Sequence, residues 1–211
     1  MIANIVCGAP NTWINLEALS FRENLIIGVD RGALFLLNLG IIPDIAIGDF
    51  DSISSIEYEQ VLKQCQNVIK LSCEKNETDT EVAINYAISK SITEIHIYGG
   101  LGGRFDHTIA NMRLLLQFAK RNILIKLIDQ TNSLTVLSAG THLLGRLPYR
   151  YLSFFALEST VTDLTLEGFK YPLNRYLLTQ DDVRCISNEM IEDSAKVIFE
   201  SGYLLMINSQ D

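Results

Sequence analysis

The sequence predicts an α/β protein in two parts: an N-terminal domain with a doubly wound, mostly parallel sheet, and a C-terminal all-β sandwich domain. Up to residue 130, short apolar runs alternate with segments of helical periodicity. That alternation is typical of a parallel sheet that helices cover on both faces. Beyond residue 130, short apolar segments recur about every ten residues between Gly, Pro, Asn and Asp, as in a sandwich or barrel. We therefore expect domains over 1–130 and 131–211.

The elements of the first domain follow from apolar runs and from helix start and stop signals. Strands are expected at 2–7, 25–29, 45–48, 68–71, 95–98 and 123–128. Helices are expected at about 13–22, 33–39, 54–64, 78–88 and 105–120. Gly40 and Pro43 end the second helix. Thr78 and Glu81 have the spacing of a capping box at the start of the fourth.

The second domain contains only short candidate strands. They lie at 134–136, 142–144, 151–155, 161–166, 176–178, 184–186, 196–199 and 204–207. Turn-forming residues separate them, and no helix of convincing length appears among them.

Composition narrows the class of protein. With 48% hydrophobic residues among 211, the chain can build a substantial core. The formal charge of −8 at pH 7 argues against nucleic acid as a partner, because nucleic-acid binding depends on cationic surface. Four cysteines, Cys7, Cys65, Cys73 and Cys185, form no C-x-x-C pair and predict reduced thiols, not a zinc site. Without an apolar run of membrane-spanning length or a leader-like start, we expect a cytoplasmic protein with no membrane partner.

Two carboxylates, Asp49 and Asp51, directly follow the apolar run 45–48. In open α/β sheets, ligands bind beyond the carboxyl ends of the strands. If the backbone stays extended there, both carboxylates point the same way and repel each other unless a cation, a proton or open water relieves the repulsion. One interpretation is a hard metal such as Mg²⁺ carrying a phosphate substrate. The alternative is a polar surface turn.

A second acidic site follows the strand at 68–71. Lys75 could contact a phosphate or simply be solvated, and Asp79 lies in the first turn of the helix that Thr78 caps. An acid in that position stabilises the helix dipole by ~0.3–1 kcal/mol. A purely structural Asp79 is therefore the alternative to a metal ligand.

A glycine-rich stretch at 99–103 follows the strand at 95–98 and leads into Arg104 and Asp106. Glycines let the backbone approach a ligand and present N–H groups to phosphate oxygens. Arg104 adds a forked cation, and Asp106 could orient Arg104 or join the metal site. The stretch lacks the P-loop pattern and the spacing of the dinucleotide fingerprint. The alternative is a structural strand-to-helix turn.

Taken together, these segments resemble the thiamine pyrophosphokinases, most closely the bacterial form. The motifs that carry the likeness are Val29-Asp30-Arg31-Gly32-Ala33, Pro43-Asp44-x-x-x-Gly48-Asp49-Phe50-Asp51-Ser52, Thr78-Asp79-Thr80-Glu81-x-Ala83, Gly99-Gly100-Leu101-Gly102-Gly103-Arg104-Phe105-Asp106-His107-x-x-x-Asn111, Gly168-Phe169-Lys170-Tyr171-Pro172-Leu173 and Ile186-Ser187-Asn188-Glu189. The resemblance implies transfer of a pyrophosphoryl group from ATP to the hydroxyethyl oxygen of thiamine, with release of AMP and with Mg²⁺. It also implies a catalytic, ATP- and Mg²⁺-binding α/β domain, followed by a β-sandwich that binds thiamine and forms a homodimer.

The resemblance implies roles for residues as well. The metal ligands would be Asp49, Asp51 and Asp79, which with Arg104 would form the catalytic set. Residues near ATP would be Lys75, Thr78, Gly102, Gly103, Arg104 and Asp106. Residues near thiamine, at a site shared between subunits, would be Tyr171, Ser187 and Asn188.

The chain departs from the family pattern in three places. The segment 179–184 lacks the Gly that is often found there, and no site role is assigned to it. Tyr171 stands where many members have Trp, and it still offers an aromatic face to a cationic thiazolium. Arg31 stands within Asp30-Arg31-Gly32 where many members have Asp-Gly-Gly, which leaves the role of Arg31 open.

Two other functions compete with this one. A haloacid-dehalogenase-like phosphatase would use Asp49 as nucleophile and Asp51 as acid/base, but its D-x-D normally follows the first core strand. A non-catalytic thiamine- or nucleotide-binding module is the second. Within the kinase interpretation, either Asp51 or Asp79 could accept the alcohol proton.

Overall fold

The computed structural model describes residues 1–9, 14–19 and 23–211. It divides into two compact units: the α/β unit, formed by 1–114 and 122–130, and the β unit, formed by 115–121 and 131–211. In the part of the chain that is described, no helix is both long and apolar enough to cross a membrane.

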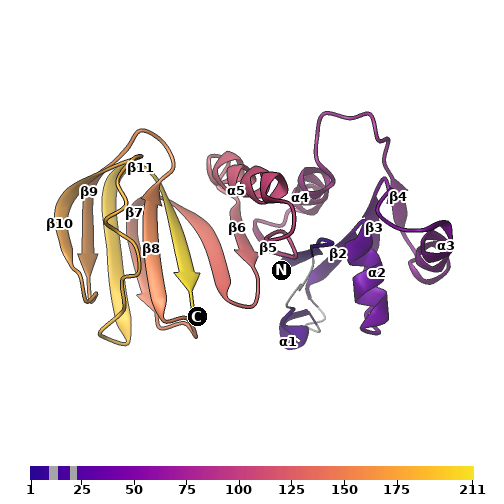
Figure 1. Cartoon of the computed structure of the whole chain (residues 1–211), viewed down its shortest axis with the longest axis horizontal. Helices are drawn as coiled ribbons and strands as arrows, with labels where there is room; N and C mark the ends of the chain where they lie inside the picture. The colour runs from indigo at the N-terminus through magenta and orange to yellow at the C-terminus, as the bar shows by residue number, and fades with distance from the viewer. Residues whose placement is uncertain (10–13, 20–22) are drawn as a thin grey trace. The chain divides into compact units, whose positions relative to one another are not determined.

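A parallel sheet forms the centre of the α/β unit (Figure 1). Its strands are β1 (Ala3–Val6), β2 (Leu25–Val29), β3 (Ile45–Gly48), β4 (Val68–Lys70), β5 (Glu94–Tyr98) and β6 (Leu124–Ile128). Their order is β4-β3-β2-β1-β5-β6, and every neighbouring pair is parallel. This confirms the predicted parallel sheet. Because the chain winds outward from β1 in both directions, the switch point where such folds bind ligands lies between the carboxyl ends of β1 and β5.

Helices cover both faces of this sheet. They are α1 (Leu16–Leu19), α2 (Arg31–Asn38), α3 (Ser55–Gln64), α4 (Asp79–Ser89) and α5 (Phe105–Ala119). Leu19 of α1 and Leu36 of α2 belong to one packed cluster with Val6 and Tyr98. Figure 1 shows α4 and α5 on the opposite side of the sheet. The helix predicted at 13–22 lies partly outside the described residues, and α1 is the portion within them.

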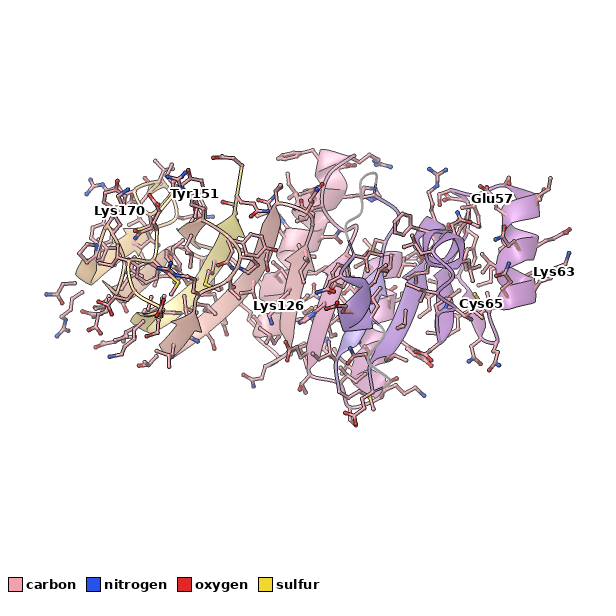
Figure 2. All side chains as sticks on the ribbon, turned by 90° about the horizontal axis from the view of Figure 1, so that it is seen from below. Glu57, Lys63, Cys65, Lys126, Tyr151 and Lys170 are labelled. Atoms are coloured by element: carbon pink, nitrogen blue, oxygen red, sulfur yellow. The ribbon has the colours of Figure 1, made fainter. Side chains whose placement is uncertain are left out.

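Local capping signals determine where two of these helices begin. Ser54 and Glu57 form a complete capping box at the start of α3, each side chain accepting the other residue's backbone N–H. At the far end of α3 the side chain of Lys63 projects away from the sheet (Figure 2). Thr78 Oγ1 accepts the N–H of Glu81 at 3.2 Å and so starts α4. The loops that follow β3 and β4 are therefore anchored at their helical ends.

The β unit is antiparallel throughout its strand pairs, which confirms the predicted all-β part. Its strands are β7 (Asn132–Gly145), β8 (Tyr151–Ala156), β9 (Thr160–Glu167), β10 (Leu173–Thr179) and β11 (Ser194–Ser209). The long β11 pairs with β7 along its whole length. On its other edge, the first half of β11 pairs with β9 and the second half pairs with β8. Strand β10 pairs with β9. The core between them includes Phe154, Phe169 and Phe199, with the first two in edge-to-face contact at 5.7 Å.

Several expected short strands of this part are wrong in their boundaries. The segments 134–136 and 142–144 belong to the single strand β7, and 196–199 and 204–207 belong to β11. The register of β11 shifts between Phe199 and Tyr203, and Gly202 at this bulge has φ 93°. A bulge interrupts the apolar alternation without ending the strand, so the sequence pattern looks like two strands.

No strand forms at 184–186. The neighbouring Asn188 instead makes an isolated bridge to Leu152. Its backbone N–H donates to the Leu152 carbonyl at 2.9 Å, and Leu152 N–H donates back at 2.8 Å.

Candidate active site

A pocket of about 730 Å³ lies at the carboxyl-terminal edge of the sheet in the α/β unit. Loops after β1, β2, β3 and β5 line it, together with the beginnings of α4 and α5. Residues predicted to act here that do line it are Asp49, Asp51, Thr78, Asp79, Gly102, Gly103 and Arg104. The pocket includes the switch point between β1 and β5, where the fold itself favours ligand binding.

Three carboxylates meet in this pocket. One oxygen from each of Asp30, Asp49 and Asp79 lies within 4.8 Å of the others. Each follows a strand or starts a helix at the same sheet edge, so the parallel topology brings them together across more than 40 positions of sequence. Carboxylate oxygens in such a group suit a hard divalent cation. We call these residues the acid cluster.

Asp30 was not among the predicted site residues. The signal available was its position, since Asp30 directly follows the strand 25–29 just as Asp49 follows β3. Its side chain is held in place: Oδ1 accepts the N–H of Phe50 at 3.1 Å. The pKa of Asp30 is raised to about 7, mainly by burial. The hydrogen bond from the Phe50 N–H lowers it, while the charge and hydrogen bond of Asp79 and the charge of Asp49 raise it. A bound cation would relieve the cost of ionising Asp30.

Asp51 lines the pocket but lies outside the acid cluster. Phe50 has φ 60°, so the backbone between the two aspartates is not extended, and the condition under which their side chains would point the same way is not met. Instead the N–H of Asp51 donates to Asp49 Oδ1 at 3.0 Å, and the Asp51 side chain is exposed. A metal role for Asp51 stays a prediction.

Lys75 supplies positive charge to the acid cluster. Its Nζ lies 2.8 Å from Asp79 Oδ1 and 3.9 Å from Asp49 Oδ2. Burial alone would lower the pKa of Lys75, but the hydrogen bond to Asp79 and the charges of Asp79, Asp49 and Asp30 raise it. The acid cluster therefore already binds the ammonium group of Lys75, which supports the inference that it can also bind a metal ion.

The glycine-rich loop after β5 is shaped by left-handed backbone at Gly99, Gly102 and Gly103, with φ 67°, 84° and 67°. Its anchor is Asn111, which is buried in α5 and donates to the Gly100 carbonyl at 2.8 Å. Beyond the loop, Arg104 Nε and Nη2 donate to Asp106 at 3.2 and 2.6 Å.

Of the two roles considered for Asp106, the geometry matches the orientation of Arg104, because Asp106 is not among the carboxylates of the acid cluster. Asp106 also accepts the N–H of His107 at 3.0 Å. The pair is exposed, with 73% and 62% of the side-chain surface of Arg104 and Asp106 open to solvent, so the Arg104 guanidinium is accessible to a ligand.

In the β unit, Tyr171 and Asn188 lie against each other. The buried Asn188 amide accepts the Tyr171 N–H at 3.0 Å and donates to the Tyr171 carbonyl at 2.9 Å. Tyr171 is 58% exposed, and Lys170 Nζ lies 5.6 Å from its ring centroid. The Lys170 ammonium thus lies within cation–π distance of this aromatic platform, a ring that is largely open to solvent.

Charged side chains surround this platform. Glu189 accepts from Lys170 at 2.8 Å and from Arg150 at 3.4 Å, and the Arg150 guanidinium lies 4.9 Å from the Tyr151 ring. Figure 2 shows Tyr151 and Lys170 at the same end of the β unit. Ser187, exposed and with φ 54°, donates its N–H to Ser153 Oγ at 3.0 Å.

Comparison with known proteins gives matches over both units. Residues 16–127 match the family model described as "Thiamin pyrophosphokinase, catalytic domain". Residues 141–204 match the model described as "Thiamin pyrophosphokinase, vitamin B1 binding domain".

Individual relatives agree with the family models. Thiamine pyrophosphokinase of Bacillus subtilis is 40% identical over 210 residues, covering 99% of this chain and 98% of the relative. Its crystal structure matches with a TM-score of 0.94 over the whole of both chains. The thiamin pyrophosphokinase of Geobacillus thermodenitrificans matches with a TM-score of 0.90 at 36% identity, covering 100% of this chain and 98% of that one. The Candida albicans structure, at 18% identity and a TM-score of 0.83 over 99% and 89%, shares the fold.

Proposed function

The chain belongs to the thiamine pyrophosphokinase family, and we propose that its activity takes place in the pocket that holds the acid cluster. The protein transfers a pyrophosphoryl group from ATP to the hydroxyethyl oxygen of thiamine, giving thiamine diphosphate and AMP. The observation that supports this location best is the convergence of Asp30, Asp49 and Asp79 beside the glycine-rich loop and Arg104. Neither alternative, the phosphatase or the non-catalytic binding module, finds support in the relatives.

Magnesium is the cofactor that the acid cluster fits best. Its donors are carboxylate oxygens, which Mg²⁺ prefers, and they lie close enough to share one ion. Asp30, Asp49 and Asp79 would hold the ion, and Asp51 at the pocket wall would reach it directly or through water. Bound there, Mg²⁺ supplies charge neutralisation for the polyphosphate.

The chain's own residues position the nucleotide in this proposal. Phosphoryl transfer depends mainly on orientation and on charge stabilisation. The Gly102 N–H donates to Thr108 Oγ1 at 3.2 Å and so fixes the loop, and the next N–H, that of Gly103, faces phosphate oxygens. Arg104, held by Asp106, contacts the transferring group. Lys75 pairs with Asp79, and with a metal ion in the acid cluster it would be free to contact the polyphosphate instead. Thr78 fixes the start of α4 and with it Asp79.

Thiamine binding belongs to the β domain, 131–211, while the α/β domain, 1–130, carries ATP and metal. Tyr171 presents an exposed ring to the cationic thiazolium. Asn188 acts through Tyr171, because its amide is committed to the Tyr171 backbone. Ser187 directly precedes Asn188 in the chain and is exposed. We propose that the thiamine site is completed across a homodimer, with the platform of one subunit facing the pocket of the other.

The four cysteines are unpaired in the structure, as predicted. A cytoplasmic location is proposed on this basis, since thiols stay reduced there.

Product analysis tests the proposed function. Purified protein is incubated with ATP, Mg²⁺ and thiamine, and nucleotides and thiamine esters are separated and quantified. We expect AMP and thiamine diphosphate in equal amounts, both dependent on thiamine. Release of inorganic phosphate without thiamine would instead support the phosphatase, and binding without products would support the non-catalytic module.

A further inference from the structure

The cationic side chains in and beside the pocket differ in whether they form ion pairs with carboxylates. Among the residues that the structure describes, four aspartates line it, Asp30, Asp49, Asp51 and Asp79, against two guanidinium groups, those of Arg31 and Arg104. A polyphosphate brings further negative charge into this acidic space, so each available cation matters.

Arg104 and Lys75 are both already paired with carboxylates. Arg104 makes a forked contact with Asp106, and Lys75 an ion pair with Asp79. Arg31, by contrast, forms no ion pair with a carboxylate among the described residues, although its charge helps to lower the pKa of Glu57. Its one described hydrogen bond runs from Nη2 to the Ser52 carbonyl at 2.9 Å.

Two neighbours direct the Arg31 side chain along the pocket wall. Arg31 is the first residue of α2 and directly follows Asp30. Its stem lies against Gly8 of the loop after β1, where a Cβ on Gly8 would be 2.8 Å from Arg31 Cβ. Its guanidinium reaches the loop after β3 at Ser52, which also lines the pocket. The side chain thus extends from the β1 loop to the β3 loop beside the acid cluster.

We propose that Arg31 binds the polyphosphate of ATP and so acts as a second cationic group beside Arg104. Unlike Arg104, Arg31 forms no ion pair that this binding would have to compete with among the described residues. This inference rests on the proposed function of the pocket. The Ser52 carbonyl holds one of the five N–H donors of the guanidinium, which leaves the others for phosphate oxygens. Because a guanidinium keeps its charge and presents a planar fork, it suits a phosphate group better than an ammonium does.

Three variants separate charge from positioning. Arg31→Gln keeps an N–H donor for the Ser52 carbonyl but removes the charge. Arg31→Lys keeps the charge but loses the fork. Arg113→Gln is the matched control, since Arg113 is an exposed arginine on α5 that does not line the pocket. Circular dichroism and Tm check that each variant is folded.

The KM for ATP, the KM for thiamine and kcat are measured for each variant. We expect Arg31→Gln to raise the KM for ATP by about tenfold or more, the loss of one charge-assisted contact. The KM for thiamine should change little, Arg31→Lys should recover part of the effect, and Arg113→Gln should match the parent protein. Direct binding of magnesium triphosphate by calorimetry should weaken in the same order, which adds a readout independent of turnover.

An unchanged KM for ATP and unchanged triphosphate affinity in Arg31→Gln would overturn the proposal. So would an equal rise in both KM values, because that pattern indicates a general disturbance of the loops. These outcomes are distinct from failure of the proposed function, in which the parent protein itself would make no AMP from ATP and thiamine.

Discussion

The carboxylate of Asp30 lies against the backbone of Gly48, so closely that a Cβ on Gly48 would come within 1.9 Å of Asp30 Oδ1. Gly48 is the last residue of β3 and immediately precedes Asp49. The absence of a side chain at Gly48 therefore allows two members of the acid cluster, Asp30 and Asp49, to approach each other.

Gly48→Ala tests this close approach. The added methyl group must displace the Asp30 carboxylate, so we expect kcat/KM to fall by about a hundredfold, as for a misplaced catalytic group. Overpacking should also cost about 1–3 kcal/mol of unfolding free energy. Gly145→Ala is the matched control, since nothing lies within 4 Å of a Cβ there. Full activity in Gly48→Ala would show that the position of Asp30 does not matter.

Asp30→Asn is expected to separate activity from stability. Turnover should fall by at least about a hundredfold, because the acid cluster loses a charged oxygen donor. The free energy of unfolding should change in the opposite direction, because the variant should be more stable than the parent at high pH. The pKa of Asp30 rises from its ordinary value of 3.8 to about 7 on folding, so the ionised parent loses stability as the pH rises through that range.

At pH 8 without metal, Asp30→Asn should therefore unfold at a higher temperature, by about 2–4 °C, which corresponds to roughly 1 kcal/mol after allowance for solvent screening. Near pH 4 the two proteins should unfold alike. Thermal scans at both pH values check this. A variant less stable than the parent at pH 8 would contradict the electrostatic argument.

Lys75→Gln examines the cation inside the acid cluster. Without the ammonium group, Asp79 and Asp49 repel each other unrelieved, so the Tm in EDTA should fall by about 3 °C. Added Mg²⁺ should close the gap, because the ion takes over the neutralising role. Lys63→Gln, at an exposed pair on α3, should change neither value. A gap that persists in saturating Mg²⁺ would indicate that Lys75 and the metal ion do not share the site.

Asn188→Ala addresses the thiamine side. The buried amide holds the Tyr171 backbone through two hydrogen bonds, so its loss should release the platform. We expect the KM for thiamine to rise about tenfold while the KM for ATP stays within about twofold. Tyr171→Ala should have a similar effect, and Tyr171→Phe, which keeps the ring, should not. An equal change in both KM values would argue against a role confined to thiamine.

The edge of the sheet at which the site lies was predictable from sequence, and part of its composition was not. Apolar runs followed by Gly or Asp located Asp49 and the glycine-rich loop, and the capping signal at Thr78 located Asp79. Strand ends in a parallel sheet meet at one edge, so these residues were expected to lie together. Asp30 carried the same signal, but a single acid after a strand is common and does not stand out. The role of Asp30 in the acid cluster depends on its close approach to Gly48, and only the three-dimensional structure shows that approach.

Other features depended on backbone conformation that sequence periodicity does not reveal. The expectation that Asp49 and Asp51 point the same way assumed extended backbone, and the left-handed φ of Phe50 removes that condition. The bulge at Gly202 joins two apparent strands into β11. The pairing of Asn188 with Tyr171 spans a turn-rich segment in which no periodic pattern exists.

The central claim, that the acid cluster is where pyrophosphoryl transfer takes place, is tested most directly by following the phosphorus atoms. ATP labelled at both the β and γ positions is mixed with Mg²⁺ and thiamine, and the label is traced in every product. We expect the parent protein to place both labels in thiamine diphosphate and to leave AMP unlabelled, and Asp49→Asn to form neither product although it remains folded. Label in inorganic phosphate irrespective of thiamine, or full transfer by Asp49→Asn, would contradict the account.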